Sequence, residues 1–177
     1  EMLSAVYEIA RDSNLALVSE LVVQEPFMEE KSREDFLEKF RRKAGKPLIG
    51  FCVLGSIFSE GIDLTGESLI GVVIVGTGLP QICNEREVIR EYFDRRQKKG
   101  YDYAYRYPGM NKVLQAAGRV IRTAQDTGTI LLMDERFLER ENQKLFPEEW
   151  DSYYGVNRQN YGKVLKDFWE ERRRRES

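Results

Sequence analysis

Three long polar side chains, those of Gln115, Arg119 and Arg122, recur at a spacing that would bring them together on one helix. At about 100° per residue, the three positions fall within about 60° of one another around the helix axis. Two arginines one turn apart repel each other unless an anion lies between them. A phosphate suits that place, because each planar guanidinium can bind two of its oxygens. The spacing therefore predicts a phosphate-binding face, and the alternative is a solvated basic face.

The apolar residues of the same segment predict how this helix is held. Pro108 is expected to start a helix that reaches about Arg122. Its apolar stripe lies on another side and consists of Met110, Leu114, Ala117 and Ile121. Gly118 costs about 1 kcal/mol relative to alanine within a helix, which indicates that another group passes close to it. One face would then pack on a sheet while the polar side chains project from the other.

Strands and helices alternate along the rest of the chain. Apolar runs of strand length occupy Leu21–Gln24, Leu48–Leu54, Leu69–Val75 and Thr129–Met133. Helical patterns cover residues 2–11, 32–44, 84–99 and 158–173, and Ser32 with Asp35 resembles a capping box at the start of the second. Strands that are apolar on both faces and separated by helices are typical of a parallel sheet covered on both sides. We therefore expect a three-layer α/β domain with a mainly parallel sheet.

The composition excludes several kinds of chemistry. The 177 residues include 28 Lys and Arg, 30 Asp and Glu, two Cys and no His. The lack of histidine excludes His-ligated zinc, Ser-His-Asp triads and imidazole acid–base catalysis. Two cysteines cannot form a four-thiolate metal centre, and Cys52 and Cys83, each among apolar residues, are expected to be buried and unreactive. No metal site is predicted, and no apolar run approaches the ~18 residues of a membrane span.

A basic segment rich in tyrosine precedes the predicted phosphate-binding face. Residues 86–122 carry more Lys and Arg than Asp and Glu, although the whole chain has a net charge of −2. Such a segment hints at a phosphate-bearing partner. The alternating Tyr101, Tyr103, Tyr105 and Tyr107 would share one face of an extended segment, where Tyr105 could stack on the bases of single-stranded nucleic acid. The alternative is that these tyrosines pack on the sheet and anchor the helix that follows.

Several segments together resemble the motifs of a known family. Gln-Ala-Ala-Gly-Arg-Val-Ile-Arg, residues 115–122, resembles motif VI of the superfamily 2 helicases, and Gly-Ser-Ile-Phe-Ser-Glu-Gly-Ile-Asp-Leu, residues 55–64, resembles their motif V. The runs at 73–80 and 131–136 match the same proteins. In this order, over essentially the whole chain, the motifs resemble the second RecA-like motor domain (helicase domain 2) of the DinG/XPD branch, the Rad3-related DNA helicases.

The resemblance implies catalytic roles for the three polar residues of motif VI. Arg119 and Arg122 correspond to arginine fingers that reach the γ-phosphate of ATP bound to helicase domain 1. Gln115 corresponds to the residue that opens motif VI, near the phosphates or the attacking water. The implied function is an ATP-dependent DNA helicase with a place in DNA repair.

Motif V implies contacts to both nucleotide and DNA. Gly61 and Asp63 match its Gly-x-Asp at the nucleotide edge, and Glu60 is assigned to the same edge. Ser56 and Ser59 lie in the same loop, where their hydroxyls can donate hydrogen bonds to the phosphates of single-stranded DNA.

The sequence contains no phosphate loop of its own. The pattern Gly-x4-Gly-Lys-Ser/Thr is absent, and Asp134 with Arg136 after the last strand is interpreted as a structural turn. ATP with Mg²⁺ would therefore be bound mainly by domain 1 of the same polypeptide, and the isolated chain is expected to be inactive. An iron–sulfur cluster, where the family has one, would also belong to domain 1.

We interpret residues 1–177 as a single domain of a longer chain, because the sequence opens on Glu1 within a helical pattern. The expected location is the cytoplasm, at the nucleoid, in a prokaryote and the nucleus in a eukaryote. One alternative is a non-catalytic RecA-like module that binds nucleic acid or protein. Another is an independent nucleotide-binding enzyme, which the missing phosphate loop disfavours. The intact motif VI face favours the helicase, since a purely structural domain has no physical need for it.

Overall fold

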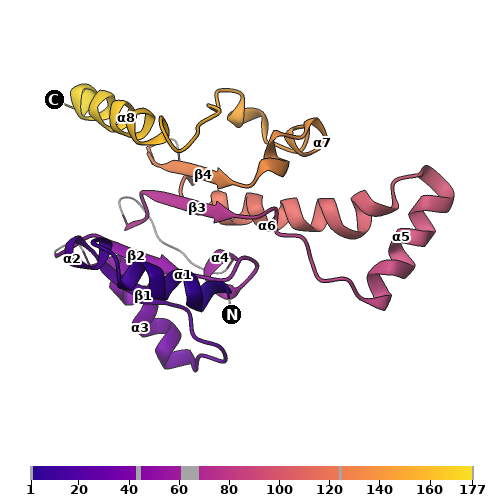
Figure 1. Ribbon diagram of the computed structural model, residues 1–177, viewed down its shortest axis with the longest axis horizontal. Coiled ribbons are helices and arrows are strands. Elements are labelled where there is room, and N and C mark those ends of the chain that lie inside the picture. Colours follow the sequence, from indigo (N-terminus) through magenta and orange to yellow (C-terminus); the bar gives the residue numbers. More distant parts are fainter. Residues whose placement is uncertain (1, 43–44, 61–67, 124, 177) are drawn as a thin grey trace. The chain divides into compact units, whose positions relative to one another are not determined.

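The computed structural model describes residues 2–42, 45–60, 68–123 and 125–176 (Figure 1). Its strands are β1 (Glu20–Val23), β2 (Leu48–Phe51), β3 (Gly71–Val75) and β4 (Thr129–Met133). Its α-helices are α1 (Met2–Arg11), α2 (Leu15–Val18), α3 (Glu30–Arg41), α4 (Ile57–Glu60), α5 (Asn84–Gln97), α6 (Tyr107–Ala117), α7 (Arg140–Gln143) and α8 (Tyr161–Glu176). The described residues also include a π-helical turn, η2 (Asp102–Arg106), and the 3₁₀ turns η3 (Glu135–Leu138) and η4 (Glu148–Trp150).

Residues 1–143 and 144–177 form two compact units. The first contains all four described strands, and the second contains η4 and α8. The interpretation of residues 1–177 as a single domain stays a prediction.

Strands β1 and β2 form a parallel pair that is covered on both faces (Figure 1). Successive side chains of a strand point to opposite faces, so Val22 and its partner Gly50 face one way and Phe51 faces the other. On the first face Val22 packs with Phe36 of α3. On the second, the ring of Phe51 meets that of Tyr7 of α1 edge-on, with 5.7 Å between centroids. This part of the chain has the three layers that the sequence predicts.

Strands β3 and β4 form a second parallel pair, in register from Gly71 opposite Thr129 to Val75 opposite Met133. Helix α6 packs on β3, and Ile74 is buried. Side chains on the other face of the pair, including Val73, Val75 and Met133, are exposed in the described structure. The predicted α/β class with parallel strands is confirmed. Among the described residues the four strands form two parallel pairs, and the sequence did not predict this division of the sheet.

The core around α6 depends on a close approach of two backbones. Met110 and Val113 are its largest fully buried side chains. A Cβ on Gly109 would lie 2.6 Å from the carbonyl oxygen of Thr77, and one on Gly78 would lie 2.6 Å from the carbonyl oxygen of Gly109. Gly78 also has φ +66°, which favours glycine. Two glycines therefore let α6 contact the loop that follows β3.

The tyrosine-rich segment is helical, so the prediction of an extended segment is wrong. Pro108 has no N–H to donate to the carbonyl of Ala104, and this carbonyl instead accepts from the guanidinium of Arg86 at 2.7 Å. The turn just before the proline is π-helical, and π-turns and prolines are both common places of irregularity within helices. The alternating tyrosines therefore do not share one face.

Two smaller predictions are also corrected. Helix α3 begins at Glu30, so Ser32 lies inside the helix and cannot form the predicted capping box. Cys83 is exposed just before α5, whereas Cys52 is half-buried as a packed thiol. Burial raises the pKa of Cys52 to about 12, which keeps its thiol protonated and unreactive near neutral pH.

Candidate functional site

The motif VI residues lie at the end of α6 and in the segment that follows it. The helix ends at Ala117, with Gly118 as its C-cap residue. Gln115 is exposed on the last helical turn, while Arg119 and Arg122 lie beyond the helix and are half-buried. The three residues are therefore close in sequence at one helix end, but the prediction of a single helical face is wrong.

Gly118 is the C-cap residue of α6, and among the described residues no other element lies against it. A Cβ there would meet only the carbonyl oxygens of Leu114 and Gln115, at 3.2 and 3.8 Å, which belong to its own turn. The prediction of a close neighbour is therefore not met within the described part of this chain. Ile121, assigned to the apolar stripe, is exposed because the helix has already ended.

The segment after α6, residues 118–123 and 125–128, is called the arginine loop below. Its first turn is tight, with the N–H of Arg119 donating to the carbonyl of Ala116 at 3.2 Å. Val120, between the two arginines, is 3% exposed. It fits against Gly128, where a Cβ would lie only 2.2 Å from the Val120 Cγ1 atom. A buried anchor therefore stands directly between the predicted arginine fingers.

Asp126 forms the second restraint on the arginine loop. Its Oδ2 atom accepts hydrogen bonds from the backbone N–H of Arg122, at 2.9 Å, and of Thr123, at 2.8 Å. These bonds favour the charged carboxylate and lower the pKa of Asp126. The sequence analysis missed this contact, although an aspartate four residues after an arginine in a turn segment was a possible signal.

The start of the motif V loop lies against α6. Gly55, with φ +82°, approaches Lys112 so closely that a Cβ would lie 2.9 Å from the lysine Cδ atom. Lys112 stands three residues before Gln115 on α6. The structure therefore brings the start of motif V to the helix that leads into motif VI, with a lysine between them that the sequence analysis did not select.

Ser56 is held by a glutamine that the sequence analysis also missed. Its hydroxyl donates to the Gln24 Oε1 atom at 2.9 Å, and the N–H of Val53 donates to the same atom at 2.9 Å. Gln24 follows β1, and its own N–H donates to the carbonyl of Phe51 at 2.8 Å. The ends of β1 and β2 therefore position the first turn of motif V.

The side chains of the remaining motif V residues lie outside the described part of the structure. Ser59 and Glu60 belong to α4, but their side chains are outside the described part of the structure. Gly61 and Asp63 lie outside the described residues altogether. Their assigned roles stay predictions.

Tyr105 is a packed side chain, and its ring is not available for stacking on a base. It is 5% exposed, and its hydroxyl donates a hydrogen bond to the Glu87 Oε1 atom of α5. This bond raises the pKa of the tyrosine. The ring of Tyr103 is stacked on Phe93, with 3.9 Å between centroids. The structure therefore favours the alternative of packed tyrosines and corrects the assignment of Tyr105, although the packing partner is α5.

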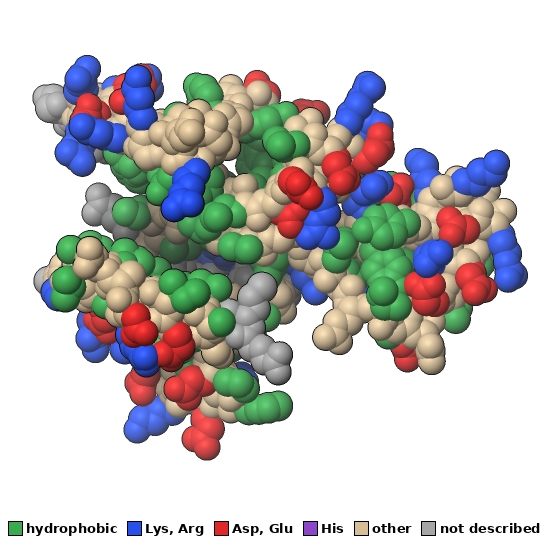
Figure 2. Space-filling view, in the orientation of Figure 1, with side chains coloured by type: hydrophobic (Ala, Val, Ile, Leu, Met, Phe, Trp, Pro, Cys, Tyr) green, Lys and Arg blue, Asp and Glu red, His purple; other side chains and the backbone are tan. Residues whose placement is uncertain are grey.

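On α5, acidic side chains balance the basic side chains of the 86–122 segment. Arg90 pairs with Glu87 at 3.0 Å, and Arg95 pairs with Glu91 at 3.3 Å. Figure 2 shows acidic and basic side chains interspersed over this helix. The predicted basic stripe does not extend over α5.

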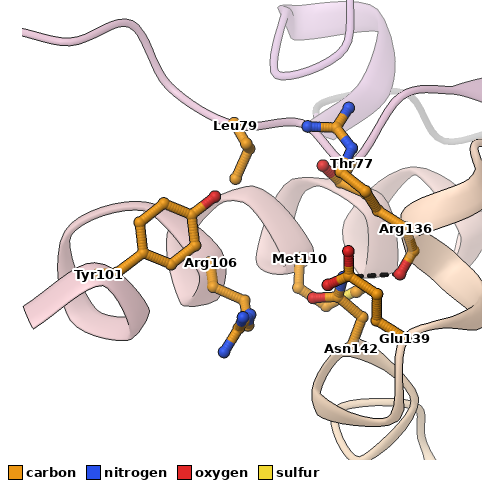
Figure 3. A pocket seen from close by; sticks show the side chains of 8 residues that line it. All are labelled: Thr77, Leu79, Tyr101, Arg106, Met110, Arg136, Glu139 and Asn142. Carbon is orange, nitrogen blue, oxygen red and sulfur yellow. Dashed lines mark hydrogen bonds between the residues drawn. The ribbon is translucent and has the colours of Figure 1, made fainter. Parts of the chain in front are cut away.

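A small cavity of about 60 Å³ lies beside α6 and does not contain any predicted site residue (Figure 3). Its two arginines are each paired with a carboxylate, Arg106 with Asp102 and Arg136 with Asp134. Asn142 donates to the carbonyl of Arg136 at 2.7 Å. Because the protein itself occupies these polar groups, the candidate site is the end of α6 and not this cavity.

The turn after β4 has the structural role that the sequence predicts. The Asp134 Oδ1 atom accepts from the backbone N–H and the Nε of Arg136, at 2.9 and 2.8 Å, and Oδ2 accepts from Nη2 at 2.7 Å. The pKa of Asp134 is lowered to about 2, mainly by the hydrogen bonds from the Arg136 side chain. The carboxylate therefore stabilises the turn in its charged form.

This lowered pKa predicts an acid sensitivity. The charged pair contributes its full stabilisation above the ordinary pKa of 3.8, and the contribution is lost as the pH falls through about 2. Because the Arg136 side chain is 41% exposed, we expect a loss of only about 1 kcal/mol. Urea unfolding between pH 5 and pH 2 checks this, with Asp134→Asn as the comparison. The variant is expected to be less stable at pH 5 and to lose less on acidification; equal acid slopes would contradict the assignment.

Comparisons with known proteins identify the family of this chain. A profile of the helicase C-terminal domain matches residues 1–153. A probable ATP-dependent helicase of Methanocaldococcus jannaschii is 29% identical over 124 residues, which cover 65% of this chain and 18% of that protein. Regulator of telomere elongation helicase 1 of Bos taurus is 28% identical over 165 residues, covering 83% and 13%. A solved XPD helicase structure superposes with a TM-score of 0.55 at 18% identity, over 81% of this chain and 29% of that one.

The chain belongs to the helicase C-terminal domain family. It is similar to these two helicases and shares its fold with the XPD structure, in agreement with the resemblance that the sequence motifs carry. The chain spans less than a fifth of the length of these two relatives.

The described residues offer neither a metal-binding cluster nor a membrane-spanning helix. Over residues 2–42, 45–60, 68–123 and 125–176, no cluster of three or more Cys, Asp or Glu side chains could hold a metal ion. Within the same ranges, none of the helices combines the length and the hydropathy that a membrane span requires.

Proposed function

We propose that this chain is the second motor domain of an ATP-dependent DNA helicase. In this proposal Arg119 and Arg122 contact the γ-phosphate of ATP, which is bound with Mg²⁺ to helicase domain 1 of the same polypeptide. The observation that carries the proposal is the anchored arginine loop. Both arginines are half-buried in a loop fixed by the 3%-exposed Val120 and by Asp126. Fixed cations of this kind stabilise developing charge without reorganising during the reaction.

The residues present fit one half of a phosphoryl-transfer site. The transferred phosphoryl group carries charge on its equatorial oxygens, which guanidinium groups neutralise well. Gln115 is exposed on the turn before the arginines, where an amide can orient a water or a phosphate oxygen. The lysine and the Mg²⁺ site that hold the β- and γ-phosphates must come from the other domain, because the chain contains no phosphate loop.

The proposal also assigns a contact with single-stranded DNA to the start of motif V. Ser56 is held by Gln24, and Gly55 lies against Lys112 of α6. A lysine and a glycine that permits close approach are suited to a phosphate backbone and carry no base preference, while the Ser56 hydroxyl, whose one proton is donated to Gln24, holds the turn in place. Tyr105, being buried, has no part in this contact.

ATP turnover by the purified 177-residue chain tests the proposal. We expect no appreciable hydrolysis, with or without single-stranded DNA, because the groups that bind the β- and γ-phosphates are not encoded here. The full-length protein in the same assay serves as the positive control and should turn over ATP. Robust DNA-stimulated turnover by the chain alone, free of contaminating ATPases, would contradict its assignment as a motor domain that needs domain 1 to bind ATP.

A titration of a fluorescent oligonucleotide tests the DNA contact in the full-length protein. Lys112→Ala should reduce the slope of log K against log salt concentration by about 0.7, the value for one phosphate contact on a single strand. Ser56→Ala removes the hydrogen bond to Gln24 that holds this turn, and should weaken binding by at most about 0.5–1.5 kcal/mol, the value of one hydrogen bond. The exposed Lys31 of α3 provides a control, and Lys31→Ala should change neither quantity. Unchanged binding in both test variants would remove this surface from the proposal.

A further inference from the structure

The two arginines differ in how the loop fixes them. The N–H of Arg119 donates to the carbonyl of Ala116, so its position follows from the end of α6. Arg122 lies three residues further on, where the chain has left the helix. Its N–H donates to the Asp126 Oδ2 atom at 2.9 Å, and the next N–H, that of Thr123, donates to the same atom at 2.8 Å.

The shared acceptor makes this contact a clamp on the backbone. Two consecutive amides that point at one oxygen restrict the orientation of the peptide groups on both sides of the Arg122 Cα atom. The N–H of Asp126 donates in turn to the carbonyl of Thr123 at 3.1 Å, so the carboxylate is itself held in place. Hydrogen bonds to a charged acceptor are about twice as strong as those between neutral groups.

The other end of the arginine loop is fixed as well. Val120 packs against Gly128, and the N–H of Thr129 donates to the carbonyl of Ile70 at 3.0 Å. Between these anchors, Asp126 makes the contact that reaches the backbone of Arg122. Removing the carboxylate would leave two amides without this acceptor while the core packing of Val120 remained.

We propose that Asp126 is a positioning residue for Arg122: its Oδ2 atom fixes the backbone from which the arginine side chain extends toward the nucleotide. This inference rests on the proposed function, in which Arg122 acts on the γ-phosphate. A displacement of about 1 Å in a group that stabilises the transition state can cost on the order of 100-fold in rate. The side chain of Asp126 itself touches no reacting atom.

Because both amides donate to the same oxygen, Asp126 Oδ2, two substitutions of Asp126 test its role. Asp126→Ala removes the acceptor, whereas Asp126→Asn keeps one carbonyl oxygen that can accept both amides. In the full-length protein we expect Asp126→Ala to lower the kcat of DNA-stimulated ATP hydrolysis by about 10–100-fold. The KM for ATP should stay unchanged, since the loss affects the transition state. Asp126→Asn is expected to restore kcat to within about threefold of the wild type.

A double-mutant cycle separates failure of this inference from failure of the proposed function. If Asp126 acts through Arg122, then Asp126→Ala should cause no further loss in a protein that already carries Arg122→Ala. Additive losses, or equal losses for Asp126→Ala and Asp126→Asn, would overturn the inference. A normal rate for Arg122→Ala would also overturn this inference, whereas normal rates for both Arg119→Ala and Arg122→Ala would overturn the proposed function. Equal thermal unfolding midpoints of Asp126→Ala and Asp126→Asn would exclude a general loss of folding as the cause.

Discussion

Alanine at either Arg119 or Arg122 is expected to lower the kcat of ATP hydrolysis by the full-length protein by about 10³–10⁵-fold. The reason is that a guanidinium neutralises charge that develops on the transferred phosphoryl group only in the transition state. The fold should persist, because both side chains belong to the arginine loop while Val120 and Gly128 hold its packing. Steady-state turnover at saturating ATP and single-stranded DNA is the measurement.

Two further variants make this result specific. Lysine in place of either arginine should recover little activity, because an ammonium group cannot bind two phosphate oxygens in a planar fork. Arg95, an exposed arginine of α5 paired with Glu91, provides the matched control, and Arg95→Ala should retain wild-type turnover. Normal turnover in both alanine variants of the loop would show that Arg119 and Arg122 form only a basic surface.

Gly109→Ala is expected to reduce the free energy of unfolding by about 1–3 kcal/mol, the usual cost of forcing extra atoms into a packed core. The new methyl group would lie 2.6 Å from the carbonyl oxygen of Thr77 and 3.1 Å from the nitrogen of Leu79. Both are backbone atoms, so neither can move aside without shifting the loop after β3. Urea unfolding of the 177-residue chain, followed by circular dichroism, measures the change.

Gly162 provides the matched control for this substitution. It also lies in a helix, α8, but apart from its own helical turn no heavy atom of the described residues stands within 4 Å of the place where its Cβ would be. Gly162→Ala should therefore leave stability unchanged or raise it by about 0.5–1 kcal/mol, the helix preference of alanine over glycine. A Gly109→Ala protein as stable as the wild type would contradict the close approach of α6 to the β3 loop.

Apolar runs predicted the strands well, because a buried strand needs a continuous apolar sequence whatever its neighbours are. The run at 129–133 coincides with β4, and β3 and β2 lie inside their predicted runs. Periodicity predicted the helix ends less well. Gly118 was interpreted as a point of close contact inside a helix, whereas glycine more often ends one, and α6 ends just before it.

The prediction of an extended tyrosine segment was wrong for a different reason. A period of two was taken as extended structure, but the rings pack on α5, and that tertiary contact outweighs the local pattern. Pro108 was correctly placed in the first turn of a helix, yet the helical segment runs on before it through a π-turn. Because the proline has no N–H, the Ala104 carbonyl accepts from Arg86 instead. Neither Arg86 nor Phe93 could be paired with this segment from sequence spacing.

The sequence motifs predicted the candidate site residues, but not the residues that hold them in position. The family resemblance selected Arg119 and Arg122, and the family assignment is confirmed by the match over residues 1–153. Gln24 and Lys112 were missed because they reach motif V from β1 and α6, which only the folded chain brings together. Asp126 was missed because its role depends on two backbone amides, and backbone contacts leave little trace in a side-chain pattern.

The central claim is that this domain completes an ATP site on a second domain, and a structure of the full-length protein with ADP and aluminium fluoride tests it most directly. We expect an Nη atom of Arg119 or Arg122 to lie about 2.7–3.2 Å from a fluoride of this phosphoryl mimic, as in a charge-assisted hydrogen bond. If both guanidinium groups lie more than about 6 Å from the mimic, beyond direct contact even in a closed complex, the arginines do not act on the nucleotide and the account is wrong.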